Sequence, residues 1–196
     1  MGSNLTERKT IIDDWENVEI PLAPKIEGVI LDPRKSAILI LDIQKQNCTC
    51  EKRPRCAASV PRIRNLLDIG REKSVFIIYS IFPHAVISDI LSDVAPQNNE
   101  KIVESGPDKF VGTDLENILK GKGIKSVVIV GTAAHGAVLH TASGAVFRGF
   151  EVVVPVDGMS FDVLYAEQYT AWHLANAPII GNHVKLTLCD EIKFND

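Results

Sequence analysis

The sequence has no long apolar stretch and no excess of positive charge. No apolar run approaches the roughly 20 residues that span a bilayer, and the first twenty residues lack the apolar core of a secretory signal. The formal net charge of -4 argues against nonspecific nucleic-acid binding and against attraction to an anionic membrane. These absences predict a cytoplasmic protein that binds neither nucleic acid nor a membrane.

Common motifs for phosphate binding and serine hydrolysis are also missing. The glycines at 131 and 136 are not followed by G-K-[ST], so this turn is not a P-loop. No G-x-G-x-x-G opens a helix after the first apolar strand, and no G-x-S-x-G nucleophile elbow occurs. We therefore expect no cofactor and no serine nucleophile.

Cysteine is scarce and unevenly placed. Cys48, Cys50 and Cys56 lie within "NCTCEKRPRC", and Cys189 lies near the C-terminus. The three clustered cysteines lack the paired C-x-x-C units of a structural zinc site, so we expect no metal. In the reducing compartment expected above, all four would be free thiols.

The sequence is otherwise that of an ordinary globular protein, with strands and helices in alternation. Its 196 residues, 45% hydrophobic and 23% charged, suit one domain. We expect a proline-punctuated arm or short hairpin over residues 1–33 and the domain over 34–196. The expected strands are 36–42, 74–80, 126–130, 151–155 and one near 184–188; the expected helices are 57–71, one capped by Thr113, 135–147 and 162–176; and 81–108 is expected to be irregular.

This alternation predicts a single-domain, Rossmann-like three-layer α/β fold with a mostly parallel sheet of about six strands. Ligands of such sheets bind at the carboxyl ends of the strands. Asp42 ends a wholly apolar strand, "SAILILD", and its carboxylate needs a hydrogen-bond donor or a cation there. From the residues alone, two interpretations of Asp42 stay open: a reactive group, or a cap of the following turn.

Two stretches carry a resemblance to a known family. "ILILDIQKQN" resembles the first-strand motif of the isochorismatase-like (cysteine hydrolase) superfamily. "KFVGTDLENILKGKGIKSVVIVGTAAHGAVLHTASGAVFRGFEVVVPVDGMS" is similar to its second signature. The resemblance implies a Rossmann-like α/β fold, assembly as dimers or tetramers, and hydrolysis of a small polar molecule. Many members use an Asp, a Lys and a Cys, with backbone N–H groups holding the oxyanion.

These roles transfer only in part. Asp42 matches the aspartate, but the cysteine position falls on Ala137, which cannot act as a nucleophile. The usual lysine position falls on Glu104. Lys109, adjacent to Phe110, is the candidate replacement because its long stem could reach the site, with a surface lysine as the alternative interpretation. The resemblance adds His135 to the candidate catalytic residues, and the expected substrate-binding residues are Gln44, Cys48, His84, Phe110, Ala133, Ala134 and Gly136.

Three hypotheses follow from Ala137. In the first, the protein hydrolyses without a cysteine, as the isochorismatases do; they resemble it in the Ala134–His135 pair, and Asp42 serves as the acid of vinyl-ether hydrolysis. In the second, Cys48 supplies the thiol. In the third, the chain is an inactive member that binds a small molecule or assembles. We favour a divergent hydrolase of C–N or vinyl-ether bonds, with the inactive member as the alternative.

Two further patterns concern partners. Tyr165, Tyr169 and Trp172 form one stripe on an expected helix, which favours a homo-oligomer. The basic cluster "EKRPR" is typical of a solvated loop, with steering of an anionic substrate as the alternative.

The metal-binding members of the superfamily carry an Asp-x-His pattern near His84, and this sequence lacks it.

Overall fold

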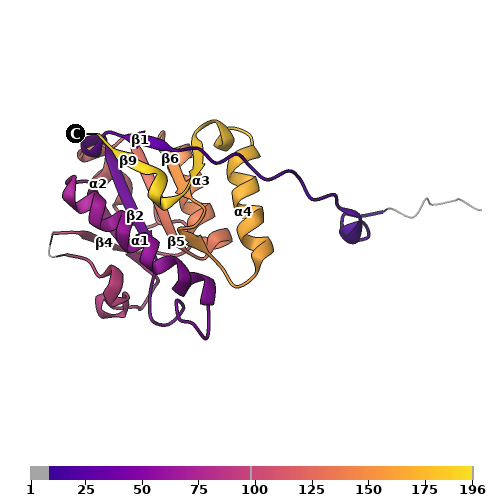
Figure 1. Ribbon diagram of the computed structural model, residues 1–196, viewed down its shortest axis with the longest axis horizontal. Coiled ribbons are helices and arrows are strands. Elements are labelled where there is room, and N and C mark those ends of the chain that lie inside the picture. The colour runs from indigo at the N-terminus through magenta and orange to yellow at the C-terminus, as the bar shows by residue number, and fades with distance from the viewer. Residues whose placement is uncertain (1–8, 98, 196) are drawn as a thin grey trace, which may run out of the picture.

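The computed structural model describes residues 9–97 and 99–195, which form a parallel sheet flanked by helices (Figure 1). The strand order is β4-β3-β2-β5-β6-β8, and every pairing between neighbours is parallel. The short β7 pairs with the end of β5 and makes the sheet seven-stranded. The predicted α/β class is therefore confirmed. The strands are β2 (Ser36–Leu41), β3 (Phe76–Ile81), β4 (Lys101–Glu104), β5 (Ser126–Thr132), β6 (Glu151–Pro155), β7 (Met159–Ser160) and β8 (Val184–Thr187).

The helices cover both faces of the sheet, because the central strands are apolar on both sides. In β2, Leu39 packs with one core and Ile40 with the other. Helix α1 lies against one face, whereas α2, α3 and α4 contribute to the core of the other. A strand buried on both faces has a continuous apolar run, as the sequence indicated. The helices are α1 (Pro54–Glu72), α2 (Leu115–Gly121), α3 (Leu139–Phe147) and α4 (Leu164–Asn176).

The structure corrects three of the predicted elements. Residues 101–104, expected to be irregular, form β4, because Ile102 and Val103 extend the sheet beside β3. Helix α1 begins at Pro54 rather than at residue 57, since proline suits the first turn of a helix. The helix expected over 135–147 begins as a π-helical turn over 134–138, and α3 proper starts at Leu139.

The N-terminal segment contains an extended arm and one strand. The Glu27 N–H donates to the carbonyl of Leu186 in β8 at 3.1 Å, and the first described residues, from residue 9 on, extend away from the domain in Figure 1. The strand β1 (Val29–Leu31) pairs in parallel with β9 (Ile192–Phe194) near the end of the chain. The described part of this segment is therefore not a hairpin, because its partner strand comes from the other end of the sequence. The first eight residues of the expected arm lie outside the described residues.

Candidate active site

The carboxyl edge of the sheet carries a buried ion pair between Asp42 and Lys109. Lys109 Nζ lies 2.7 Å from Asp42 Oδ2, and the hydroxyl of Ser80 donates to Asp42 Oδ1 at 2.8 Å. The Lys109 side chain is only 1% exposed. Burial of two opposite charges is stable only with close pairing and further hydrogen bonds, and this site has both.

Lys109 reaches Asp42 from a loop that packs on α3. Its ammonium group also donates to the carbonyl of Ser105, and its backbone N–H donates to the hydroxyl of Thr141. A β-carbon at Gly144 would lie 2.8 Å from the carboxylate of Asp108, so the glycine permits this close packing. Lys109 is therefore an internal residue and not a solvated surface lysine.

The surroundings of Asp42 act on its pKa in opposite directions. Burial raises the pKa of Asp42 above its ordinary value, while Lys109, the Ser80 hydroxyl and the charge of Arg53 oppose the rise. A carboxyl group with a raised pKa keeps its proton at higher pH and can donate it to a substrate. Asp42 also takes a positive φ of 55°, which turns the chain out of β2 at this edge.

The turn after β5 faces the same edge because of a close approach at Gly131. Leu41 and Gly131 are neighbours in the parallel register of β2 and β5. Gly131 has a φ of 137°, and a β-carbon there would lie 2.1 Å from the carbonyl oxygen of Leu41. Only glycine fits this position. The turn from Ala133 to Ala137 is thereby held next to the strand that ends in Asp42, and Ala137 is 5% exposed.

The Cys48 hypothesis is wrong. Cys48 and Cys56 form a disulfide with Cα atoms 5.3 Å apart, so the expectation of four free thiols is corrected. Cys48 is buried in the core beside α1 and has no thiol to attack a substrate. Cys50 is free and exposed, and Cys189 is free and buried. Burial and the neighbouring Asp157 raise the pKa of Cys189, which disfavours its thiolate.

The other predicted site residues differ in their surroundings. Gln44 is fully buried, its amide oxygen accepts from the Phe82 N–H, and its Nε2 has no partner among the described residues. Phe110 is buried in the core with Ala134 and Ala137, stacked 6.1 Å from Phe150.

The two predicted histidines are exposed. The ring of His135 meets Phe161 edge-on at 4.3 Å. The backbone N–H of His84 donates to Glu104, the residue at the usual lysine position. This contact directs the loop of His84 toward β4, and no contact in the described chain joins His84 to Asp42 or Lys109.

Sequence reasoning missed Ser80 and Arg53. Ser80 ends the expected strand 74–80, and β3 is the neighbour of β2, so the register could have indicated its contact with Asp42. Arg53 lies in the basic "EKRPR" cluster, yet its Nη1 donates to the Thr132 hydroxyl at 3.1 Å. The loop between β2 and α1 folds back over the end of β5, which local sequence does not reveal.

Two negative observations concern other kinds of site. Within residues 9–97 and 99–195, no three His, Cys, Asp or Glu side chains cluster to hold a metal ion. The same residues include no helix that is long and apolar enough to cross a membrane.

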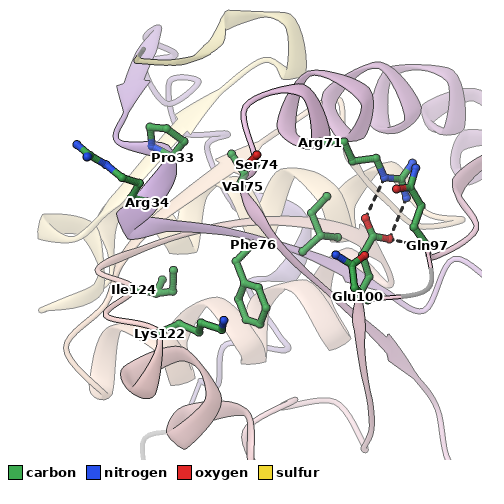
Figure 2. Close-up of a pocket in the computed structure, with 12 residues that line it drawn as sticks. Pro33, Arg34, Arg71, Ser74, Val75, Phe76, Gln97, Glu100, Lys122 and Ile124 are labelled. Carbon is green, nitrogen blue, oxygen red and sulfur yellow. Dashed lines mark hydrogen bonds and ion pairs between the residues drawn. The ribbon is translucent and has the colours of Figure 1, made fainter.

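A hollow of about 450 Å³ opens at the amino ends of the strands, around Phe76 and Ile124 (Figure 2). Arg71 and Glu100 form an ion pair on its wall. The hollow lies at the opposite edge of the sheet from Asp42, because Phe76 begins β3 and Ser80 lies near its end. Catalytic residues of parallel α/β sheets lie at the carboxyl edge, so we place the candidate site there.

The fold and the site together define a class of protein: parallel α/β domains with a buried carboxylate–ammonium pair at the carboxyl edge of the sheet. The family model described as the isochorismatase domain matches residues 36–180. The chain therefore belongs to the isochorismatase family, and the resemblance noted in the sequence is confirmed.

Individual relatives agree with this family. The chain is 28% identical over 136 residues to the secreted isochorismatase effector Isc1 of Verticillium dahliae, covering 63% of this chain and 72% of that protein. It is 29% identical over 84 residues to N-carbamoylsarcosine amidase of an Arthrobacter species, covering 42% of this chain and 32% of that protein.

Solved structures share the fold. An isochorismatase-like hydrolase from Alkaliphilus metalliredigens superposes with a TM-score of 0.72 at 22% identity, covering 80% of this chain and 96% of that one. The nicotinamidase of Staphylococcus aureus gives a TM-score of 0.69 at 21% identity, covering 78% and 98%.

Proposed function

We propose that this protein is a hydrolase of small polar molecules in which Asp42 is the general acid and base and no cysteine takes part. Family membership supports a hydrolase, and the buried pair of Asp42 with Lys109 at the carboxyl edge of the sheet is the observation that carries the proposal. Ala137 offers no nucleophile, and Cys48 is held in a disulfide. Vinyl-ether hydrolysis fits these residues best, because it needs a proton donor and water but no thiol.

The proposed reaction uses one proton and one water. Protonated Asp42 gives its proton to the terminal carbon of the vinyl ether, and the adjacent ether carbon becomes an oxocarbenium ion. Water attacks that carbon and returns a proton to the Asp42 carboxylate. The carbon–oxygen bond of the hemiketal then breaks: the hemiketal hydroxyl loses its proton, the departing oxygen gains one, and a ketone and an alcohol are released. Lys109 holds the Asp42 carboxylate in place and stabilises its negative charge after the first step.

A substrate panel with blocked thiols tests this proposal. The protein is treated with iodoacetamide and assayed with isochorismate as a vinyl ether, with nicotinamide as an amide, and with N-carbamoylsarcosine. We expect turnover of isochorismate that is unchanged by alkylation, because Cys50 is the only exposed free cysteine in the described chain. Turnover of an amide that alkylation abolishes would contradict the proposal.

The alternative function is an inactive family member that binds a small molecule. Ala137 at the nucleophile position is the observation that favours it. The same panel separates the two functions: binding of a panel compound by calorimetry, without turnover of any, identifies the binding protein.

We also propose that the chain forms a homo-oligomer through α4. Tyr165, Tyr169 and Trp172 are 61%, 39% and 40% exposed on this helix, and such aromatic clusters are typical of subunit interfaces. Analytical ultracentrifugation of the wild type and of Trp172→Glu tests the assembly, with Arg64→Ala on the exposed side of α1 as the control. A wild-type protein that stays monomeric at all concentrations would refute it.

The expectation of four free thiols followed from the expected cytoplasmic location. A disulfide between Cys48 and Cys56 is typical of oxidising compartments, and the Verticillium relative is named as secreted. We therefore propose that the protein functions in an oxidising environment. Mass spectrometry of protein alkylated in its native source before isolation tests this. We expect Cys48 and Cys56 to be linked and unmodified, and alkylation of both would contradict the proposal.

A further inference from the structure

The loop between β2 and α1 brings one arginine to the candidate active site. Arg53 Nη1 donates to the hydroxyl of Thr132, the last residue of β5, at 3.1 Å. Its Nε lies 3.3 Å from a carboxylate oxygen of Asp162, and its guanidinium carbon lies 4.9 Å from the centre of the Phe161 ring. Arg53 therefore lies over the end of β5, next to the turn that contains Ala137.

The loop that carries Arg53 is fastened on both sides. The disulfide between Cys48 and Cys56 closes the loop around Arg53. Two residues further on, Arg55 forms a bidentate ion pair with Glu167 of α4. A guanidinium on a loop held in this way loses little additional freedom when it binds a ligand.

Glu167, the partner of Arg55, also contacts Phe161, which lies next to Arg53. Its carboxylate also accepts from the backbone N–H of Phe161 at 2.8 Å. The guanidinium of Arg53 lies over the Phe161 ring, and the His135 ring makes a T-shaped contact with the same ring. Arg53, Phe161 and His135 thus form a continuous rim from the β2–α1 loop to the turn after β5.

Arg53 also has capacity for a further partner. The Arg53 side chain is 21% exposed, and its partner Asp162 is 44% exposed. In the described chain its polar contacts involve Nε and Nη1, whereas Nη2 carries two more N–H groups. The positive charge also acts on Asp42, whose pKa it lowers against the effect of burial. The guanidinium is therefore within electrostatic range of the proposed acid.

We propose that Arg53 binds a carboxylate of the substrate, so that the site takes small carboxylic acids in preference to neutral compounds. Planar guanidinium groups bind carboxylates through two parallel hydrogen bonds. A carboxylate on Arg53 places the rest of a small molecule between the Phe161 ring and the Asp42 edge. The substrate's carboxylate competes with the exposed Asp162 for the same cation. This proposal rests on the proposed function and adds to it the residue that binds the carboxylate of the substrate.

A merely structural Arg53 is the competing explanation. In that case Arg53 only ties the loop to Asp162 and Thr132, and its loss acts by loosening the rim. The two explanations differ in what happens when Asp162 is removed. A substrate-binding Arg53 keeps or gains affinity for anions in Asp162→Asn, whereas a structural Arg53 loses its function in that variant as well.

Binding calorimetry tests the proposal without requiring turnover. The probes are chorismate, a vinyl ether with two carboxylates, and its uncharged dimethyl ester. We expect the wild type to bind chorismate more tightly than the ester. Arg53→Gln is expected to weaken chorismate binding by about 10- to 100-fold and to leave ester binding within about twofold. Arg53→Lys keeps the positive charge but cannot form two parallel hydrogen bonds with a carboxylate. Its affinity for chorismate should therefore lie between those of the wild type and Arg53→Gln.

Melting temperatures of all variants establish that each is folded, and Asp162→Asn is the matched control. The proposal is overturned if the wild type does not bind chorismate more tightly than the ester. It is also overturned if Arg53→Gln lowers the affinity for both probes by the same factor, or if Asp162→Asn lowers the affinity for chorismate as much as Arg53→Gln does. Arg53-dependent binding without hydrolysis of any panel compound would leave this inference standing and refute the proposed hydrolase.

Discussion

Lys109 Nζ and Asp42 Oδ2 lie 2.7 Å apart, although 67 positions separate the two residues in the chain. The carboxylate ends the central strand β2, and the ammonium group comes from the loop beyond the edge strand β4. Ser80 completes the contacts of the carboxylate from β3, which lies between them. One hydrogen-bonded group thus joins three consecutive strands of the sheet at their carboxyl ends.

Loss of Lys109 should destabilise the protein strongly. Lys109→Met leaves Asp42 buried without a cation, and removal of one partner of a buried pair costs about 3–5 kcal/mol in the free energy of unfolding. Urea denaturation at pH 7 measures this. Lys120→Met is the control, because Lys120 pairs with Glu116 on the surface of α2 and should change the midpoint little. Equal effects of both substitutions would mean that the Asp42–Lys109 pair is not buried in solution.

Activity should decline as the pH rises. Asp42 acts as an acid only when it is protonated, and burial raises its pKa above the ordinary 3.8. The rate should therefore stay high on the acidic side and fall as the pH passes through the raised pKa. The same proton favours the folded state, so this contribution to stability also falls as the pH rises from 3.8 through the raised pKa. A rate that increases over this pH range would indicate that ionised Asp42 is the active form.

Reduction of the disulfide should loosen the β2–α1 loop. Its cysteines are 8 positions apart, and closure of so short a loop stabilises the folded state by about 2–3 kcal/mol. A Cys48→Ser, Cys56→Ser double variant should lose about this much stability in urea denaturation. Cys50→Ser is the control, since Cys50 is exposed and free. Four reactive thiols in the native, untreated protein would contradict the disulfide.

Replacement of Gly131 should disturb the site more than replacement of another glycine. A β-carbon at Gly131 would collide with the Leu41 carbonyl, and its φ of 137° is unfavourable for alanine. Gly131→Ala should therefore cost about 2–4 kcal/mol in unfolding free energy. Gly121→Ala has open space near the end of α2 and should be neutral or slightly stabilising. Thermal unfolding of both variants makes the comparison, and equal melting temperatures would argue against the close approach of β2 and β5.

The sequence predicted the sheet well because its central strands are buried on both faces. Their continuous apolar runs depend on burial alone, and Asp42 stood out as the one charge at the end of such a run. The edge strand β4 is short and exposed on one side, so its sequence resembles that of a loop and was predicted as one.

The partners of Asp42 required the tertiary path of two loops. Lys109 follows a loop whose course depends on packing against α3, and its spacing differs from the family pattern. Arg53 and the Cys48–Cys56 pair depend on how the β2–α1 loop closes, which cysteine spacing alone does not determine. Local sequence reports burial and turn preferences, whereas these contacts join residues from separate elements.

The most direct test of Asp42 as the acid of the proposed reaction is the rate of isochorismate hydrolysis by Asp42→Asn relative to the wild type. Asparagine keeps the size of the side chain and removes the transferable proton. The account predicts a fall in kcat of about 10²–10⁴-fold, with Asp68→Asn on the surface of α1 unchanged as the control. Wild-type hydrolysis that Asp42→Asn retains within about threefold would contradict the role of Asp42.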